Sequence, residues 1–303
     1  MAGARERRAV GGVLLLDKPV GLSSNAALQS VRMLYRARKA GHAGSLDPLA
    51  SGMLPIGFGD ATKFCGFLLD ADKTYRFRCR LGITTTTGDA EGEVLSRTPV
   101  VRCERTAIDA VLSHFIGVIE QTPPMYSALK HHGRPLYRLA RQGIEIERLP
   151  RRVTIHELVL LGVDSDELEL QARCSKGTYI RVLAQDIGQA LGCGAHVSAL
   201  RRLSVAPFEA QAMVTLDALR DIATDGLEAL DARLLPIDAG LVAWPRITVD
   251  GDQARRLQSG LTVLAPTAAH GEVRLYAQDQ GFFGIGAIDG DGRLAPRRMM
   301  SQS

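Results

Sequence analysis

The sequence VTIHELVLLGVDSDELELQARC, residues 153–174, contains two runs rich in valine, isoleucine and leucine on either side of an acidic turn at Asp164-Ser165-Asp166. Runs of this composition separated by a short polar turn are typical of two antiparallel strands. We therefore predict a β-hairpin with strands over 153–163 and 167–174. A sheet that contains this hairpin cannot consist of parallel strands alone.

The segments on both sides of the hairpin alternate between strands and helices without a regular order. A half-buried strand is indicated over 74–81, where Tyr75 lies on the apolar face and the arginines lie on the other. Further strands are predicted over 12–16, around Val94 and over 196–205, and helices over 24–35, 60–69, 104–115 and 179–191. This order favours an α+β fold with a mixed, mostly antiparallel sheet flanked by helices.

The length of the chain indicates two units. Its 303 residues exceed what one hydrophobic core usually organises, and a hydrophobic fraction of 46% supports full folding. Pro236 and Pro245 bracket a connector, and the tail that follows carries one short helix over 250–258 and a hairpin over 288–293. We predict a large unit over residues 1–240 and a small β-rich unit over residues 241–303.

Charge and cysteine content limit the classes of function. The net charge of +4 permits a polyanionic partner without requiring one. The cysteines at positions 65, 79, 103, 174 and 193 form no Cys-x-x-Cys pair, so neither a disulfide framework nor a zinc site is expected. The apolar run 13–16 is too short for a signal peptide or a membrane span, and we expect a cytoplasmic protein.

Basic residues gather in the segment 123–152. Arg134, Arg138 and Arg141 have helical spacing, with leucines on the opposite side, and Lys130 precedes them. Two interpretations stay open at this point. The segment is either a solvated amphipathic helix or a surface that binds a polyanion such as a nucleic acid.

The loop GHAGSLDPLASG, residues 41–52, is built to present Asp47. Its three glycines permit backbone angles or close approaches that a side chain would block, and Pro48 fixes the chain directly after the acid. The alternative is an ordinary turn in which Asp47 caps a helix. Spacing alone does not separate these two interpretations.

A second segment, SKGTYIR over residues 175–181, leads into the predicted helix 179–191. Gly177 allows a sharp entry, which places Tyr179 and Arg181 near the first turn of the helix, where backbone N–H groups are free. Taken alone, Arg181 could be a surface residue. Tyr75 could equally be a core residue that points its hydroxyl to solvent.

Six motifs occur in a fixed order along the chain. They are Lys18-Pro19, Gly41-His42-x-Gly44-x-Leu46-Asp47-Pro48, Asp72-Lys73-x-Tyr75, Met125-Tyr126-Ser127-Ala128-Leu129-Lys130, Ser175-Lys176-Gly177-Thr178-Tyr179-Ile180-Arg181 and Gly192-x-Gly194-Ala195-His196-Val197-x-x-Leu200-Arg201-Arg202. Together they resemble the bacterial TruB family, the tRNA pseudouridine synthases that isomerise uridine 55 of the T-loop. The resemblance implies a pseudouridine synthase fold with a thumb-like insertion at about 123–152 and a PUA-like C-terminal domain.

The resemblance also implies roles for individual residues. Asp47 matches the catalytic aspartate that acts at ribose C1′, either as a nucleophile or by helping to remove the 2′ proton. Arg181 matches the arginine that pairs with this aspartate, and we expect it to depress the pKa of Asp47. Tyr75 matches the tyrosine that stacks on the target base and helps the C5 proton to leave.

Further matches surround the base or contact the RNA. Tyr179 and Leu200 match residues around the uracil ring, and His42 matches the histidine that occupies the space of the extruded base or contacts its phosphate. Lys18 matches a residue that supports the catalytic loop and carries no direct chemistry. The basic residues of the thumb, among them Lys130, Arg134, Arg138 and Arg141, would contact phosphates.

The implied partner is tRNA, whose target uridine must be flipped out of its folded loop. We expect an isomerase (an intramolecular transferase) that needs no cofactor and no metal, with no obligate protein partner and a monomeric state. Two alternatives remain. One is an RNA-binding chaperone that folds tRNA with catalysis secondary or lost; the other is a glycosidase, which would require a second positioned carboxylate that does not stand out in these motifs.

Overall fold

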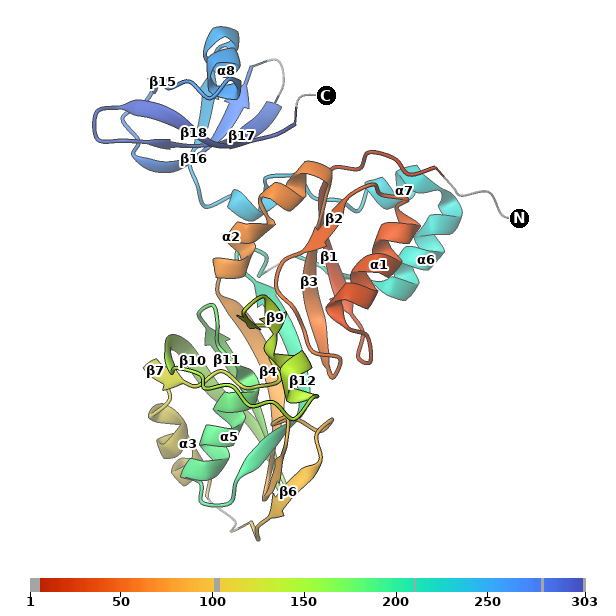
Figure 1. Cartoon of the computed structure of the whole chain (residues 1–303), viewed down its shortest axis with the longest axis vertical. Coiled ribbons are helices and arrows are strands. Elements are labelled where there is room, and N and C mark those ends of the chain that lie inside the picture. The colour runs from red at the N-terminus through yellow and green to blue at the C-terminus, as the bar shows by residue number, and fades with distance from the viewer. Residues whose placement is uncertain (1–5, 101–103, 210, 279–280, 302–303) are drawn as a thin grey trace.

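The computed structural model describes residues 6–100, 104–209, 211–278 and 281–301. Its main feature is a nine-stranded mixed sheet (Figure 1). Along the sheet the strands follow the order β13 (Val214–Thr215), β1 (Gly12–Lys18), β3 (Ala50–Phe58), β12 (Ala195–Val205), β4 (Lys73–Leu81), β11 (Glu167–Cys174), β10 (Arg151–Asp164) and β7 (Gly117–Gln121), and β2 (Ala40–His42) pairs with β3.

Most neighbours in this sheet are antiparallel, which confirms the predicted class. Only two pairs in the described sheet are parallel, β1 with β13 and β3 with β12. The predicted hairpin is present as β10 and β11, with Leu160 opposite Leu170 and a bulge between Leu160 and Gly162. Bulges of this kind increase the local twist of the hairpin.

Helices cover the two halves of the sheet separately. Around β1 and β3, one core includes residues of α1 (Ser24–Leu34), α6 (Leu216–Ile222) and α7 (Leu227–Asp231). Around β4, β10, β11 and β12, another core includes residues of α3 (Arg105–Ser113) and α5 (Ile180–Ala190). Tyr75 and Leu200 pack against both cores, so they mark the place where the two halves meet. Short 3₁₀ turns at Ala223–Asp225 and Ala239–Leu241 complete the region.

The segment 60–69 is not the single helix that its spacing predicts. It divides into a 3₁₀ turn, η1 (Gly59–Lys63), and a short helix, α2 (Cys65–Asp70). The buried ammonium of Lys73 donates hydrogen bonds to the carbonyls of Leu68, Leu69 and Ala71, which satisfies the free carbonyls at the end of α2. This contact with a residue of the next strand is invisible to local periodicity.

The segment between β4 and α3 contains one more strand than predicted. Besides the expected strand near Val94, now β6 (Val94–Arg97), it contains β5 (Ile83–Thr85), which pairs with β6. The short run Ile83–Thr85 lacks enough alternation to be recognised as a strand from sequence.

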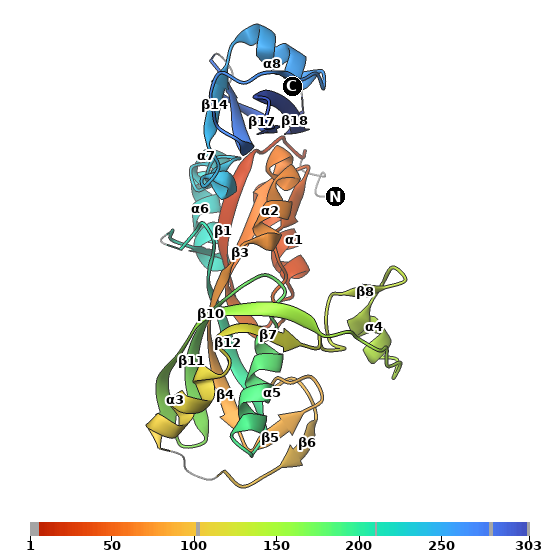
Figure 2. The same ribbon diagram turned by 90° about the vertical axis from the view of Figure 1, so that its left-hand side faces the viewer.

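The basic insertion leaves the sheet at Gln121 and returns at Arg151, which are register partners on β7 and β10. It contains β8 (Lys130–His131), β9 (Arg134–Pro135) and α4 (Leu136–Ala140), and it projects from one side of the sheet (Figure 2). The prediction that Arg134, Arg138 and Arg141 share one helix is therefore wrong, because Arg134 lies in β9. The helix begins at Leu136, directly after Pro135, and ends at Ala140, so that Arg138 is the only one of the three arginines inside it.

A second sheet of five strands forms the C-terminal part of the chain. Its order is β14 (Arg246–Val249), β16 (Gly271–Ala277), β17 (Gly281–Ile288), β18 (Arg293–Met299) and β15 (Val263–Leu264), and α8 (Gly251–Gln258) packs on it. The predicted helix and hairpin of this region are both present. The sheet has its own core, which includes Leu257, Val273 and Leu275.

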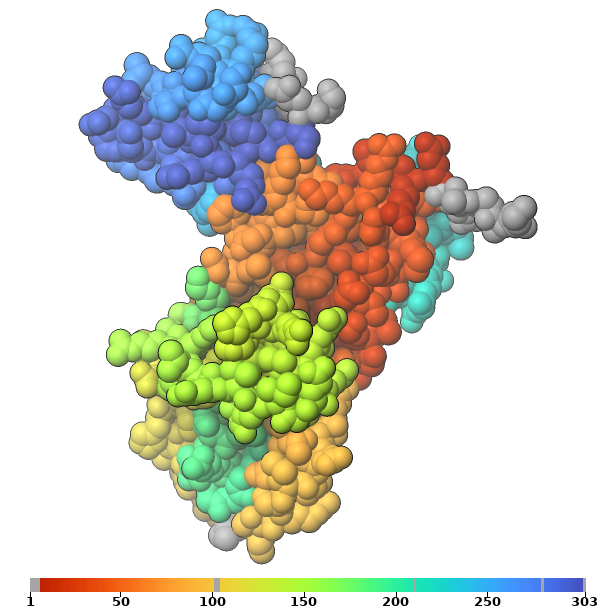
Figure 3. Space-filling view, in the orientation of Figure 1, coloured from red at the N-terminus to blue at the C-terminus, as the bar shows by residue number. Residues whose placement is uncertain are grey.

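The second sheet is joined to the first through a polar and an aromatic contact. Arg274 donates to Asp238 Oδ2 at 2.8 Å, and both side chains are largely buried. Phe67 packs edge-on against Trp244, with ring centroids 4.8 Å apart. At the other end Ser301 donates its backbone N–H to Asp60 at 2.7 Å. These contacts hold the C-terminal part against η1, α2 and the segment around Asp238. Figure 3 shows the two parts in contact.

Candidate active site

The loop between β2 and β3 has its shape fixed by close backbone packing. At Gly52, which has a φ of 101°, an added Cβ would lie 2.1 Å from the carbonyl oxygen of Arg202. Only glycine fits there. Gly44 also has a positive φ, whereas Gly41 has neither a positive φ nor a close neighbour, so the expectation for Gly41 is not met. The loop thus depends on two of its three glycines.

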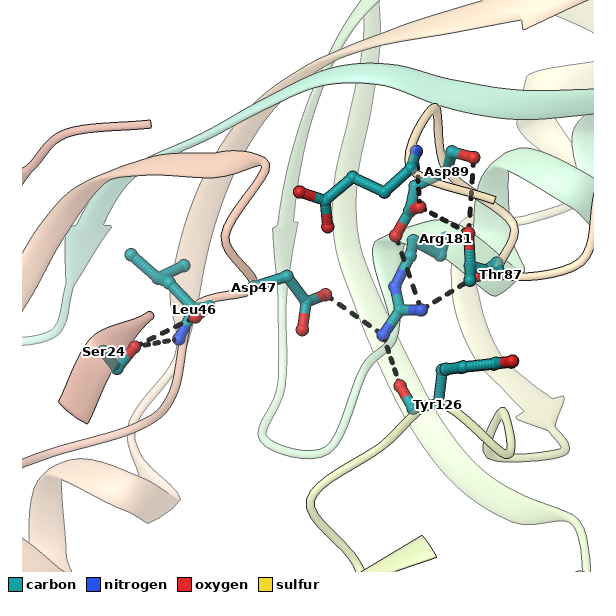
Figure 4. Close-up of polar contacts among 8 residues, drawn as sticks. Ser24, Leu46, Asp47, Thr87, Asp89, Tyr126 and Arg181 are labelled. Atoms are coloured by element: carbon teal, nitrogen blue, oxygen red, sulfur yellow. Dashed lines mark hydrogen bonds and ion pairs between the residues drawn. The ribbon is translucent and has the colours of Figure 1, made fainter. Parts of the chain in front are cut away.

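Hydrogen bonds on both sides of Asp47 hold this loop in place, and Figure 4 shows those between Ser24 and Leu46. The buried hydroxyl of Ser24, in the first turn of α1, accepts a hydrogen bond from Leu46 N–H at 2.7 Å and donates to Leu46 O at 3.0 Å. After the acid, Ala50 N–H donates to Asp47 O at 3.0 Å. The backbone of Asp47 is therefore fixed by α1 on one side and by β3 on the other. Its side chain is 44% exposed.

Arg181 reaches Asp47 from the opposite half of the sheet. Gly177, with a φ of 79°, turns the chain into α5, and Arg181 lies in the first turn of that helix. Its Nη2 lies 3.0 Å from Asp47 Oδ2 and also donates to Tyr126 O at 2.7 Å, while its Nη1 donates to Thr87 O at 2.9 Å. The side chain is only 7% exposed, so Arg181 is a buried cation with fixed orientation and not a surface residue.

Asp89 is a second carboxylate at Arg181 that the sequence analysis did not identify. Its Oδ2 lies 3.5 Å from Arg181 Nη1, and its Oδ1 accepts hydrogen bonds from Thr87 Oγ1 and from the backbone N–H of Glu91. Asp89 is 4% exposed at its side chain, whereas Asp47 is open to solvent. The only sequence signal was an acidic, threonine-rich loop. Arg181 is thus held between one buried and one accessible carboxylate.

The pKa of Asp47 differs from the expectation. Although the Asp47 side chain is 44% exposed, the surrounding protein removes part of the water from its carboxyl group, and this desolvation raises its pKa above the usual value. Arg181 lowers the pKa by less, Asp89 raises it further, and Lys18 lowers it. The expected depressed pKa is therefore wrong in direction. Because Arg181 also neutralises Asp89, it provides less stabilisation to the charged form of Asp47 than it would in an isolated pair.

Aromatic and aliphatic side chains named from the motifs lie around this ion pair. Tyr75 on β4 stands opposite Arg202 on β12. Leu200, also on β12, stands opposite Ala50 on β3, and Ala50 follows Asp47 by three residues. Burial raises the pKa of Tyr75. Tyr75 and Leu200 therefore form partly exposed walls close to Asp47.

Two further motif residues lie at the edges of this region. His42 on β2 has its Nδ1 buried without a hydrogen-bond partner among the described residues, and burial lowers its pKa. Tyr179 directly precedes α5, and burial raises the pKa of its hydroxyl. His42 enters from the half of the sheet that carries Asp47, and Tyr179 from the half that carries Arg181.

Lys18 is fully buried at the end of β1. Its ammonium donates hydrogen bonds to the carbonyls of Pro19 at 2.8 Å and Leu22 at 2.7 Å, which fixes the turn before α1. Burial lowers its pKa to about 8, although Asp47 acts in the other direction. Lys18 thus holds the turn before α1, and its support of the Asp47 loop stays a prediction.

The basic residues of the insertion do not join the Asp47 region. Lys130, Arg134, Arg138 and Arg141 are exposed, and none of them forms an ion pair with a carboxylate in the described part of the chain. Arg141 lies over the ring of Tyr137, with its guanidinium carbon 5.9 Å from the ring centroid. These four cations are free to contact a polyanion.

A substitution tests whether the Ser24 hydroxyl fixes the position of the Asp47 loop. We expect Ser24→Ala to lower the rate of the reaction at saturating substrate by about tenfold, because small displacements of a reacting group are costly. It also leaves Leu46 N–H buried without a partner, at a cost of about 1–3 kcal/mol of stability. Single-turnover kinetics and thermal unfolding measure the two effects.

Ser23→Ala is the matched control. Ser23 caps α1 through a 3.1 Å hydrogen bond from Ala26 N–H and does not contact Leu46. It is expected to lose about 1 kcal/mol of stability and to keep the wild-type rate. Equal rate losses in the two variants would show that the Ser24 hydroxyl has no special effect on the loop.

Comparison with solved structures identifies the fold. A chain in a crystal structure of a Cbf5-Nop10-Gar1 complex superposes with a TM-score of 0.73 over 96% of this chain and 85% of that chain, at 24% identity. A chain in a structure of an H/ACA RNP bound to a substrate RNA containing 2′-deoxyuridine gives 0.72 over 99% and 93%, at 21% identity. At these identities the likeness concerns the fold alone.

Comparison of sequences is more specific. Three family descriptions match in succession: the N-terminal domain of the TruB family pseudouridylate synthases over 32–180, the tRNA pseudouridylate synthase B C-terminal domain over 181–242, and a pseudouridine synthase II TruB C-terminal domain over 245–300. The chain is 56% identical to a tRNA pseudouridine synthase B of Nitrosococcus oceani over 97% of its length and 96% of that protein's. One of Coxiella burnetii is 53% identical over 98% and 96%.

Fold and sequence together define a class of enzyme. The chain is a pseudouridine synthase, which makes it an isomerase. It belongs to the TruB family.

Proposed function

We propose that this enzyme isomerises uridine 55 in the T-loop of tRNA to pseudouridine, with Asp47 acting at ribose C1′. The observation that carries the proposal is the ion pair between accessible Asp47 and buried Arg181, 3.0 Å apart, at the junction of the two sheet halves. The names of the relatives support tRNA as the substrate. The position within the tRNA follows from the motif resemblance.

The reaction exchanges one bond to the sugar for another. The bond from uracil N1 to C1′ breaks, the base rotates, a bond from C5 to C1′ forms, and the C5 proton leaves while N1 gains one. As in glycoside hydrolysis, positive charge develops at the sugar, and an ionised carboxylate stabilises it or bonds to it. Asp47 either attacks C1′ or removes the 2′ proton to give a glycal. Both routes require the anionic form that Arg181 favours.

The neighbouring side chains have complementary roles in this proposal. Tyr75 stacks on the uracil ring and assists the departure of the C5 proton, and Leu200 and Tyr179 line the ring. A uridine inside a folded loop must first be flipped out, at a cost of a few kcal/mol. His42 fills the position that the base leaves or contacts its phosphate. Lys18 supports the loop without taking part in the chemistry.

The outer parts of the chain serve RNA binding in this proposal. The insertion over about 123–152 acts as a thumb whose exposed cations contact phosphates of the T-arm. We assign residues 1–240 to the catalytic domain and residues 241–303 to a PUA-like RNA-binding domain. The self-contained core of the second sheet supports this division.

The central experiment maps modification in unmodified tRNA incubated with pure protein and no additive. Pseudouridine has the mass of uridine, so it is located by chemical labelling followed by mass spectrometry. We expect label at position 55 alone. Binding without any labelled product would indicate an RNA chaperone instead, and label at another position would refute the assignment of uridine 55.

The salt dependence of binding tests the thumb. We expect the combined variant Arg134→Ala, Arg138→Ala and Arg141→Ala to bind tRNA more weakly. The slope of log affinity against log salt should fall by about 2 to 3, since each lost phosphate contact removes roughly 0.7–0.9. Arg220→Ala on α6, an exposed arginine paired with Asp217, is the control and should keep the wild-type slope. An unchanged slope in the triple variant would exclude these arginines from phosphate contact.

The proposal extends to the state of the enzyme in the cell. We propose a monomer that acts in the cytoplasm without a cofactor, a metal or an obligate protein partner. No helix in the described ranges is long and apolar enough to cross a membrane. Sedimentation of the pure protein at the concentration used for the assay tests the monomer, and activity after exhaustive dialysis against chelator tests the independence from metal.

A further inference from the structure

Gln121, the last residue of β7, holds the residue before α5 by both of its backbone groups. Its Nε2 donates to Tyr179 O at 3.3 Å, and its Oε1 accepts a hydrogen bond from Tyr179 N–H at 3.0 Å. Gln121 is 3% exposed, so water does not compete for these bonds. None of the six sequence motifs includes this residue.

The position of Tyr179 makes this contact relevant to the ion pair. Tyr179 is the N-cap of α5 and has no side-chain capping bond, and Arg181 follows two residues later. On the other side the chain arrives through Gly177, a residue with a positive φ in open space. Before the helix, Thr178 Oγ1 donates to Ser175 O at 2.9 Å, but no side chain of this segment caps α5 itself. The amide of Gln121 holds the backbone of the N-cap residue from another strand.

A second contact joins the same part of the chain to Arg181. Tyr126 O accepts a hydrogen bond from Arg181 Nη2, the nitrogen that also lies beside Asp47. Gln121 and Tyr126 lie on either side of the pair Pro123-Pro124, directly after the insertion leaves the sheet at Gln121. The base of the insertion thus makes two contacts at the start of α5. The Gln121 side chain binds the backbone of Tyr179, and the backbone carbonyl of Tyr126 binds the Arg181 side chain.

We propose that Gln121 is a positioning residue, which sets Arg181 against Asp47 by fixing the start of α5. The inference rests on the proposed roles of Asp47 and Arg181. It assigns to the base of the insertion a function in the chemical step, in addition to the RNA binding assigned to its exposed cations. Without the amide, α5 can shift relative to β7, and the guanidinium shifts with it.

Kinetics and binding separate positioning from support of the insertion. Gln121→Met keeps the volume and removes both hydrogen bonds, and Gln121→Ala removes the side chain. With tRNA carrying tritium at uridine C5, we expect single-turnover release of tritium to slow by about tenfold to a hundredfold in both, since displacements near 1 Å have effects of this size. The tRNA Kd should stay within about threefold.

Two further variants sharpen the test. Gln121→Glu keeps an acceptor for Tyr179 N–H and should recover part of the lost rate relative to Gln121→Met. Gln189→Ala removes an exposed glutamine at the far end of the same helix and should keep the wild-type rate and affinity. A weakened Kd with a wild-type rate in Gln121→Met would overturn the proposal, because Gln121 would then support RNA binding only.

A crystal structure of the Gln121→Met variant gives a readout that does not depend on the RNA substrate. We expect the Arg181 guanidinium to lie beyond hydrogen-bond distance from Asp47. An ion pair retained at the distance of the parent protein would overturn the inference even if activity fell. Failure of the parent protein to modify uridine 55 would instead count against the proposed substrate, and the two failures are therefore distinguishable.

Discussion

Asp47→Asn is expected to abolish pseudouridine formation while tRNA binding stays close to normal. The amide has nearly the same size but cannot attack C1′ or accept the 2′ proton as an anion does. Loss of a group that bonds to the reacting centre typically lowers the rate by roughly 10⁴-fold or more. Binding should persist because the phosphate contacts proposed for the thumb lie elsewhere. Single-turnover assays and filter binding with unmodified tRNA measure both quantities.

Two further variants serve as controls for Asp47→Asn. Asp47→Ala excludes recovery of activity through slow deamidation of the asparagine. Asp164→Asn replaces an exposed acid at the end of β10, far along the chain from the loop, and should behave like the parent protein. Appreciable product from both Asp47 variants would remove this residue from its proposed role.

Arg181→Met is expected to reduce both activity and stability. Its removal leaves Asp89 buried beside no cation, and breaking a buried ion pair from one side typically costs about 3–5 kcal/mol. Asp47 also loses the charge that favours its anionic form, and the loss of such preorganised electrostatic stabilisation typically lowers the rate by about 10²–10³-fold. Denaturant unfolding and single-turnover kinetics report the two losses separately.

A double variant separates the loss of stability from the loss of rate. Adding Asp89→Asn to Arg181→Met removes the uncompensated charge, so stability should recover in part while the rate stays low. Arg181→Lys keeps the charge but lacks the planar fork that reaches Asp47, Thr87 and Tyr126 at once, and it should recover little activity. If the double variant regained the rate as well as the stability, Arg181 would act only through Asp89.

The parts of the fold that sequence predicts are those with strong local patterns. The hairpin of β10 and β11, strand β4 and helix α5 follow from alternation and helical spacing, and each was located within one or two residues. The broken helix at 60–69 depends on Lys73, which belongs to the next strand. Arg134 lies outside α4 because that helix begins only after Pro135, at Leu136. The proline is a local signal, but the prediction followed the spacing of the arginines.

The residues of the candidate site likewise divide into those that sequence motifs predict and those that only the structure shows. Asp47 and Arg181 each belong to a glycine-containing sequence motif, and the structure brings the two side chains together. Asp89 and Gln121 act through contacts between segments distant in sequence, which no local pattern encodes. The direction of the Asp47 pKa shift depends on burial and on the second carboxylate, so it could be derived only once the three-dimensional surroundings were known.

The contacts of the C-terminal sheet and tail with Asp60 and Asp238 fix the distance between the two parts of the enzyme. With Arg274 bound to Asp238 at one end and Ser301 bound to Asp60 at the other, the C-terminal sheet has little freedom to swing. If the C-terminal sheet binds RNA as proposed, an arm held there presents its loop at a constant height relative to Asp47. We therefore expect tRNA with a lengthened or shortened arm to be modified more slowly than the parent tRNA.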